Sequence, residues 1–242
     1  MTLRGGTTVR WIVRTLSEIC VTVGALIVLF VVYLLFWTGV RADSAMDGEI
    51  GRLQDRWSAG PVTAPARPPA PGAGAGTAPA ARPHGYPSGA SFAVMYIPRF
   101  GADWAKPVLE GTAADVLKRG LGHYDRTAHL GALGNFSVAG HRRTYGDPFK
   151  DFPRLHPGDA VVLTDGRTWF TYRIDNRPYT TLPGDIGVID PVPRKSGFHG
   201  PGRYLTLTTC EPEWGHSHRL IAWAHLDSTQ PAARGRPSAL TG

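Results

Sequence analysis

Cys210 is the residue of this 242-residue chain best suited to covalent chemistry. The other cysteine, Cys20, lies in a long apolar run, where it fills space like an ordinary apolar side chain. Cys210 ends the apolar segment TLTTC, a predicted strand, and the polar segment EPEWGHSHR follows it. A cysteine at a strand end beside a loop is placed like a nucleophile, whereas the alternative is a buried, inert thiol.

A thiol nucleophile needs a partner, because free cysteine has a pKa of about 8.5 and histidine is the usual proton carrier near neutral pH. The region after residue 90 offers His123, His129, His141, His156, His199, His216, His218 and His225. The segment NFSVAGHRRTYGDPF places His141 where a predicted strand meets a glycine and a polar turn. His216 and His218 could instead be paired metal ligands, but no third ligand has suitable spacing. We therefore predict that His141 is the partner of Cys210.

Two further residues could serve acyl transfer, which needs a group that stabilises a developing oxyanion. Arg219 follows Cys210 by nine positions and begins the apolar segment RLIAWAHL. A loop between neighbouring strands would return Arg219 close to Cys210, although a surface arginine at a strand start is the alternative. Tyr145, four residues after His141, could present its ring to a substrate, or it could only pack within its own turn.

Short strands must position these residues, because residues 91–228 form one domain by size and show mostly two-residue periodicity. The Asp165-Gly166 pair predicts a hairpin, and Thr112 precedes a predicted short helix. Many short strands and few helices predict a β-barrel or a β-sandwich. The predicted strands are Phe92–Ile97, Lys106–Leu109, Phe136–Ala139, Ala160–Thr164, Trp169–Asn176, Gly187–Ile189, Tyr204–Thr209 and Arg219–His225.

Residues 19–40 form an uncharged run that predicts a transmembrane helix. A helix of this length spans a hydrocarbon core of about 30 Å. A signal peptide would have a shorter apolar run and a small-residue cleavage site, and a buried core helix would be shorter. Positive flanks stay in the cytoplasm, which predicts a cytoplasmic segment at 1–18 and an external C-terminal region. The basic residues before the run are Arg4, Arg10 and Arg14.

Three further segments flank the predicted domain. Residues 41–57 contain an apolar stripe at i, i+4, i+7 and i+11, formed by Met46, Ile50, Leu53 and Trp57, which predicts a short juxtamembrane helix. Residues 58–90 are rich in alanine, proline and glycine, as in a linker that would hold the domain away from the membrane. Residues 229–242 are predicted to be a flexible tail.

The composition excludes several classes of protein. The 26 Lys+Arg against 19 Asp+Glu give a net charge of +7, but no stretch forms the dense basic patch expected of a nucleic-acid binder. Two cysteines are too few for a disulfide-rich scaffold or a four-cysteine zinc site. The 30 glycines and 21 prolines argue against a helical bundle.

These residues together resemble a known family. TLTTC at 206–210, the arginine of HRLIAWA and the upstream AGHR are similar to the signature of the sortases, cysteine transpeptidases of Gram-positive cell surfaces. HRRTYGDPF and LTTCEPEW are most similar to the class E sortases of actinobacteria. The resemblance implies a closed sortase-type β-barrel with short helices, held by one N-terminal transmembrane helix in the cell membrane.

The resemblance also implies a role for each candidate residue. Cys210 would attack the carbonyl between Thr and Gly of a sorting signal and form a thioester, and His141 would protonate the departing amine. Arg219 would hold the oxyanion, and Thr209 would shape the carbonyl site. Class E sortases carry a tyrosine in the loop where Tyr145 lies, and they are associated with Leu-Ala-x-Thr-Gly signals in place of Leu-Pro-x-Thr-Gly signals.

The implied partners are secreted proteins that carry the signal, a cell-wall peptide amine as acceptor, and the membrane; no cofactor, metal or nucleic acid is expected. One alternative is an L,D-transpeptidase, whose motif has a glycine before the cysteine and an arginine soon after it, both lacking in TTCEPEW. Another is a non-enzymatic surface module tethered to the membrane. Loss of Cys210, His141 or Arg219 would indicate such a module, and all three are present.

Overall fold

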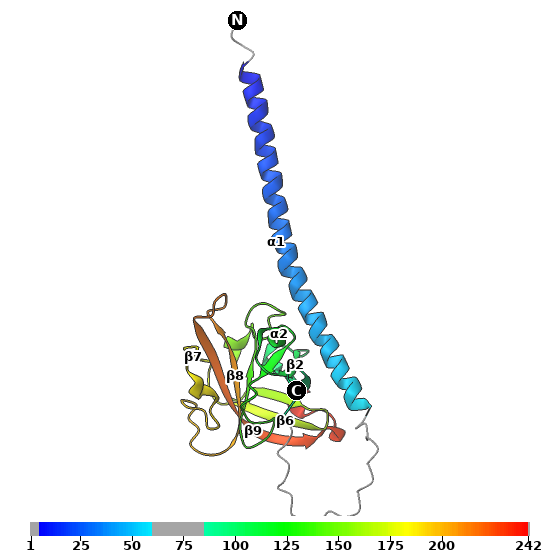
Figure 1. The fold of residues 1–242 in the computed structure, drawn as a ribbon, viewed down its shortest axis with the longest axis vertical. Coiled ribbons are helices and arrows are strands. Elements are labelled where there is room, and N and C mark those ends of the chain that lie inside the picture. The colour runs from blue at the N-terminus through cyan, green and yellow to red at the C-terminus, as the bar shows by residue number, and fades with distance from the viewer. Residues whose placement is uncertain (1–4, 60–84, 242) are drawn as a thin grey trace, which may run out of the picture.

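The structure, a computed structural model, describes residues 5–59 and 85–241. It consists of one long N-terminal helix, α1 (Gly5–Ser58), and a β-barrel that lies beside the C-terminal part of this helix (Figure 1). The predicted linker at 58–90 falls mostly on residues outside the described ranges.

The strands form a nine-stranded sheet within the described residues, in the order β6-β5-β1-β2-β3-β4-β8-β9-β7. Strand β6 also pairs with β9, which closes a barrel and leaves β7 outside it. The predicted closed β-barrel is therefore confirmed. The bounds are β1 Ser91–Tyr96, β2 Ala105–Glu110, β3 Leu121–His123, β4 Gly134–Ala139, β5 Ala160–Thr164, β6 Thr168–Ile174, β7 Tyr179–Thr181, β8 Arg203–Glu211 and β9 His218–Pro231.

The barrel interior is filled by apolar side chains that alternate along the strands, and the loops add Phe149, Phe152 and Leu155. Full burial of a large apolar side chain contributes about 1.5–3 kcal/mol, so this core accounts for much of the stability of the domain. A smaller cluster outside the barrel wall packs Val188, Ile221 and Trp223 together. The short helices are α2 Ala114–Leu117 and the 3-10 turns η1 Pro98–Phe100, η2 Phe152–Arg154, η3 Ile186–Ile189, η4 Ala232–Arg234 and η5 Ser238–Leu240.

Several predicted elements differ from the observed ones. Strands β3 and β7 contain three residues each, too few for a recognisable period, and the predicted strand at Gly187–Ile189 belongs to the 3-10 turn η3. The N-cap position of helix α2 is Ala113 in place of the predicted Thr112, and no side-chain capping hydrogen bond forms there. The predicted flexible tail begins inside β9, because Thr229 and Gln230 pair with β6.

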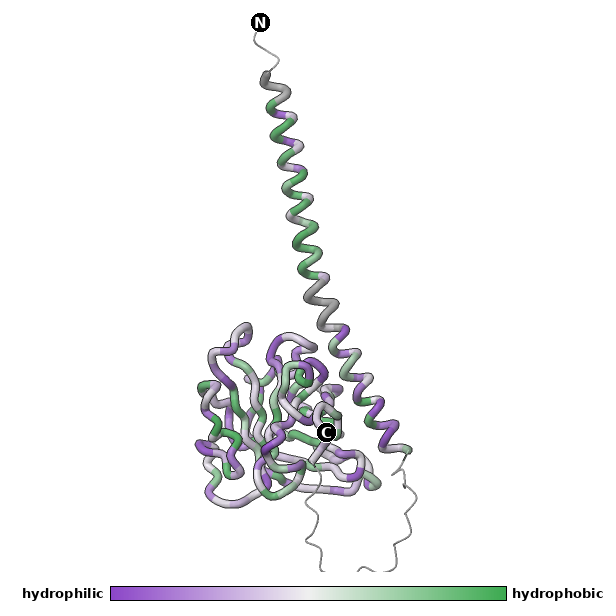
Figure 2. The backbone as a smooth tube through the Cα atoms, viewed as in Figure 1, coloured by the Kyte–Doolittle hydropathy of each residue, from purple (hydrophilic) through white to green (hydrophobic). Residues whose placement is uncertain are grey.

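Helix α1 combines the predicted transmembrane and juxtamembrane helices in one uninterrupted element. Its stretch Val9–Tyr33 is apolar and long enough to cross a membrane, and none of its most apolar part is buried against the protein. This stretch overlaps the predicted span at 19–40. Figure 2 shows the hydrophobic colour concentrated there and more hydrophilic residues where α1 passes the barrel.

The C-terminal part of α1 packs against β1 and β2, so the barrel lies directly on the helix. Met46 and Leu53, from the predicted apolar stripe, are fully buried, whereas Ile50 and Trp57 are half-buried.

The same helix face buries Glu49. Burial alone would raise the pKa of its carboxyl, but hydrogen bonds from Ser91, Arg52 and Arg119 outweigh this effect and lower the pKa to about 2. Glu49 is therefore charged at neutral pH and holds α1 on the barrel.

Candidate active site

Parallel pairing of β4 with β8 brings His141 and Cys210 to the same end of the barrel. Ala139 is in register with Thr208, so each of the two site residues lies two positions beyond this pair. The pairing continues past β4, because the Gly140 N–H donates to the Thr208 carbonyl at 3.1 Å. Cys210 is a free, half-buried cysteine.

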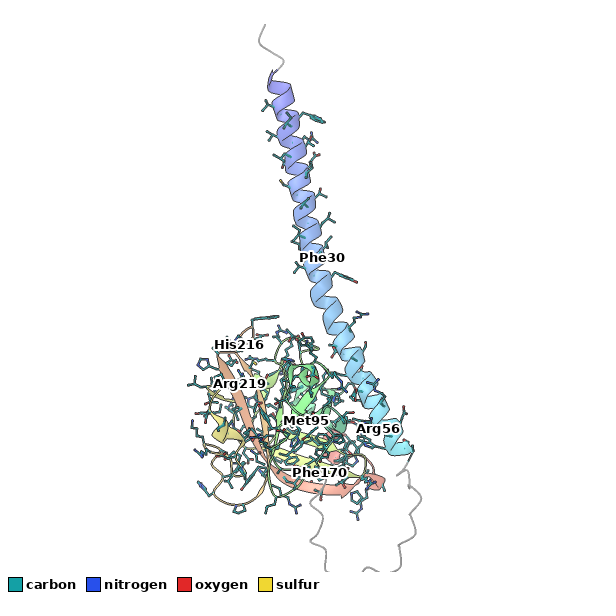
Figure 3. The ribbon with its side chains drawn as sticks, in the orientation of Figure 1. Phe30, Arg56, Met95, Phe170, His216 and Arg219 are labelled. Carbon is teal, nitrogen blue, oxygen red and sulfur yellow. The ribbon has the colours of Figure 1, made fainter. Side chains whose placement is uncertain are left out.

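Antiparallel pairing of β8 with β9 places Arg219 directly opposite Cys210. Side chains at opposite positions of such a pair have Cβ atoms about 4.5–5.5 Å apart. The Arg219 Nη1 donates to the carbonyls of His216 and His218, each at 2.9 Å, so the guanidinium also braces the β8–β9 loop. Figure 3 shows Arg219 and His216 at the end of the barrel that points toward the apolar part of α1.

Thr209 is buried, and its hydroxyl donates to the Gly140 carbonyl at 2.8 Å. This bond ties the residue before Cys210 to the residue before His141. The geometry supports a positioning role, in which Thr209 fixes the spacing between the two strand ends.

His141 is half-buried, and its environment favours the neutral imidazole. Burial lowers the pKa of His141, and the nearby Lys118 ammonium lowers it further. Tyr145 packs on His141 with ring centroids 5.3 Å apart, and the Lys118 Nζ lies 5.4 Å from the centroid of Tyr145. At neutral pH, His141 can therefore accept a proton.

Two charge pairs that the sequence does not predict connect the loop after His141 with the loop after Cys210. Arg142, next to His141, forms an ion pair with Glu211, next to Cys210. Arg143 Nε lies 2.7 Å from Glu213 Oε1, and the Arg143 guanidinium stacks on Trp214 at 4.5 Å from the ring centroid. The signal was two arginines after the histidine and two acids after the cysteine.

A small pocket of about 90 Å³ opens beside Arg219. Thr208 and Ile221 contribute to its strand side, and Leu182 and Ile186 from the segment after β7 line the other side. Leu182 is 62% and Ile186 is 76% exposed, so this segment presents apolar side chains to solvent in the pocket beside Arg219.

The paired histidines of the β8–β9 loop have local partners. Ser217 Oγ lies 3.0 Å from His218 Nδ1, and the His216 carbonyl accepts from Arg219. Within the described ranges, no group of three or more His, Cys, Asp or Glu side chains is placed to hold a metal ion.

Comparison with known proteins identifies the family of this chain. Residues 95–227, which include all of the candidate site residues, match the sortase domain. The chain belongs to the sortase family. Sortase SrtE1 of Streptomyces coelicolor is 37% identical over 234 residues, which cover 94% of this chain and 60% of SrtE1. The chain thus spans about three fifths of that relative's length.

Solved sortase structures share the fold. Sortase E from Streptomyces avermitilis is 71% identical with a TM-score of 0.61, and the match covers 64% of this chain and 99% of that one. Sortase E1 from S. coelicolor, solved with a tripeptide in its active site, is 41% identical with a TM-score of 0.60 over 63% of this chain and 97% of that one. These relatives confirm the predicted resemblance to class E sortases.

Proposed function

We propose that this sortase is a cysteine transpeptidase that cleaves a sorting signal between Thr and Gly and joins the Thr carbonyl to a cell-wall peptide amine. The observation that carries the proposal is the strand register that brings His141, Cys210 and Arg219 to one end of the barrel. The family match and the class E relatives support it.

In the first half-reaction, the neutral His141 accepts the thiol proton of Cys210, and the thiolate attacks the Thr carbonyl carbon. Arg219 donates to the oxyanion that forms. The C–N bond to glycine then breaks, the His141 imidazolium gives its proton to the departing amine, and a thioester remains on Cys210. The lowered pKa of His141 supports this order, because a neutral imidazole is needed at the start.

In the second half-reaction, the acceptor amine attacks the thioester carbon, and His141 takes the proton that the amine loses. The C–S bond breaks, Cys210 regains its proton, and a new amide joins the signal to the acceptor. After both half-reactions, Cys210 and His141 are back in their starting protonation states, so the proposed reaction needs no cofactor.

The substrate of this reaction is a secreted protein with a Leu-Ala-x-Thr-Gly-like signal. The pocket beside Arg219 and the exposed Leu182 and Ile186 support binding of an apolar side chain of the signal there. The Tyr145 ring packs at a tilt against His141, and its hydroxyl would accept the N–H of the signal alanine, which proline lacks.

The proposed location is the cell membrane, crossed once by α1 with the N-terminus in the cytoplasm and the catalytic domain outside. The apolar stretch Val9–Tyr33 and the basic residues Arg10 and Arg14 at its start support this topology. Protease added to wall-stripped cells should cut the chain within 58–90, and a denaturing gel should then show the catalytic domain separated from α1. Cleavage only after lysis would contradict the orientation.

The test of the function is a cleavage assay with the full chain in nanodiscs, in which kcat/KM is measured for Leu-Ala-x-Thr-Gly and Leu-Pro-x-Thr-Gly peptides with an amine acceptor. We expect at least a 10-fold preference for the alanine peptide, because the bound signal would cover the Tyr145 hydroxyl and proline would leave this acceptor unpaired, at a cost of about 1–3 kcal/mol. Tyr145→Phe should narrow this preference, whereas a peptide with its residues scrambled should not be cleaved. A protein that cleaves neither signal would refute the proposed function.

A further inference from the structure

The turn that follows His141 has a backbone conformation that most residues avoid. Thr144, Tyr145, Gly146 and Asp147 are consecutive and have positive φ angles of 82°, 50°, 78° and 46°. Non-glycine residues rarely adopt this region, and they keep it only where the surrounding contacts hold them there. The candidate active site therefore contains a strained turn whose shape depends on its neighbours.

Some of these contacts come from the turn itself and from the barrel. The Thr144 N–H donates to Asp147 Oδ1 at 2.5 Å, and Arg143 Nη1 lies 3.2 Å from Asp147 Oδ2. The Trp104 Nε1–H donates to the Pro148 carbonyl at 3.2 Å. These bonds hold the two ends of the turn.

The middle of the turn rests against α1. A Cβ atom added at Gly146 would lie 2.7 Å from Asp43 Oδ1 and 3.0 Å from Met46 Cε. Met46 is fully buried, and Asp43 Oδ1 is itself fixed by an ion pair with Lys106 Nζ at 2.8 Å. The helix therefore passes against the turn without room for a side chain between them.

The same helix is fixed on the barrel beyond the turn. Leu53 is 1% exposed, and Glu49 accepts a hydrogen bond from Ser91 Oγ at 2.5 Å and pairs with Arg119 at 3.3 Å. Arg56 Nη2 donates to the Ser91 carbonyl at 3.0 Å, and Figure 3 shows Arg56 beside the barrel. These contacts hold α1 in one place relative to β1, so the helix can act as a fixed support for the turn.

We propose that the segment 42–57 of α1 is a positioning element of the active site, which braces the strained turn after His141 through Asp43 and Met46. The inference deepens the proposed function, on which its activity readout rests. The membrane anchor then has a second task, because it keeps His141 and Tyr145 in place beside Cys210. Loss of this support would let the turn relax and expose His141 to solvent.

The experiment compares Met46→Ala with Leu53→Ala in the full chain in nanodiscs. Both side chains are fully buried on the same face of α1, but only Met46 contacts the turn at Gly146. Met46→Leu, which keeps the volume, is the conservative variant. The measurements are kcat and KM for peptide cleavage, the thermal unfolding midpoint, and the pKa of His141 from NMR titration of its ring protons.

We expect Met46→Ala to lower kcat about 10-fold or more, because a misplaced catalytic group can cost about 100-fold. The pKa of His141 should rise toward its ordinary value, because burial is the main cause of its lowering. Leu53→Ala should lower the unfolding midpoint, but its kcat should stay within about 2-fold of wild type and its His141 pKa should not change. Met46→Leu should retain activity.

Equal losses of kcat in Met46→Ala and Leu53→Ala would overturn the proposal, since the helix would then only stabilise the domain. An unchanged kcat and His141 pKa in Met46→Ala would overturn it as well. The NMR titration does not need turnover. If the wild type cleaves no peptide, the proposed function fails, while a rise in the His141 pKa in Met46→Ala alone still supports the brace.

Discussion

Replacing Glu211 by glutamine should slow peptide cleavage while the domain stays folded. The Arg142 side chain, next to His141, is only 9% exposed and pairs with Glu211, which is 29% exposed. Removing one partner of a fully buried pair costs about 3–5 kcal/mol. Because Glu211 is partly solvated and glutamine keeps an acceptor oxygen, we expect a loss of about 1–3 kcal/mol in stability. The turn should shift, and kcat/KM should fall by about 10- to 100-fold.

Glu213→Gln is the matched control for this prediction. Glu213 follows Cys210 by three positions and pairs with Arg143, the neighbour of Arg142, but its side chain is 41% exposed. Exposed pairs contribute about 0–1 kcal/mol, so kcat/KM should stay within about 3-fold of wild type. The assay is kcat/KM for the sorting peptide, together with thermal unfolding and the rate of Cys210 alkylation by iodoacetamide. Equal effects of the two substitutions, or an unchanged kcat/KM in Glu211→Gln, would refute the reasoning.

The remaining predictions concern Arg219, Lys118 and Glu49. Arg219→Ala should lower kcat by about 10²–10³ through loss of an oxyanion donor, with partial recovery in Arg219→Lys; a change of only a few-fold would make Arg219 structural. Lys118→Gln removes a positive neighbour and should raise the pKa of His141, so the acid limb of the pH profile of kcat/KM should move to higher pH. The pKa of Glu49 is lowered from 4.5 to about 2 on folding, so its contribution to stability is present above pH 4.5 and is lost as the pH falls through about 2. Unfolding measured between pH 2 and 6 should show this slope in the wild type and a smaller one in Glu49→Gln.

Local patterns in the sequence predict a β-barrel or a β-sandwich and the candidate site residues, and the resemblance to sortases selects the closed barrel. Apolar segments with two-residue periodicity define most strands, and a strand-end placement is visible for both His141 and Cys210. The antiparallel return of the chain predicts the position of Arg219, which the β8–β9 register bears out. Strands β3 and β7 are missed because three residues carry no measurable period.

Contacts between distant segments could not be predicted in the same way. The apolar stripe of α1 indicates that one face of the helix is buried, but it does not indicate which surface covers that face. Glu49 looks like a solvent-exposed acid in the sequence, yet it is buried against Ser91 and Arg119, which lie 42 and 70 positions away. Likewise, the charge pair of Arg142 with Glu211 exists only because β4 and β8 end side by side.

The central claim is that the reaction passes through a thioester on Cys210, and intact-protein mass spectrometry tests it most directly. Wild-type protein mixed with a sorting peptide without an acceptor should gain the mass of the peptide acyl group up to Thr, and hydroxylamine should remove it. Cys20→Ala should form the same adduct, whereas Cys210→Ala should form none and should release no glycine-containing fragment. Cleavage by Cys210→Ala, or an adduct on another residue, would contradict the account.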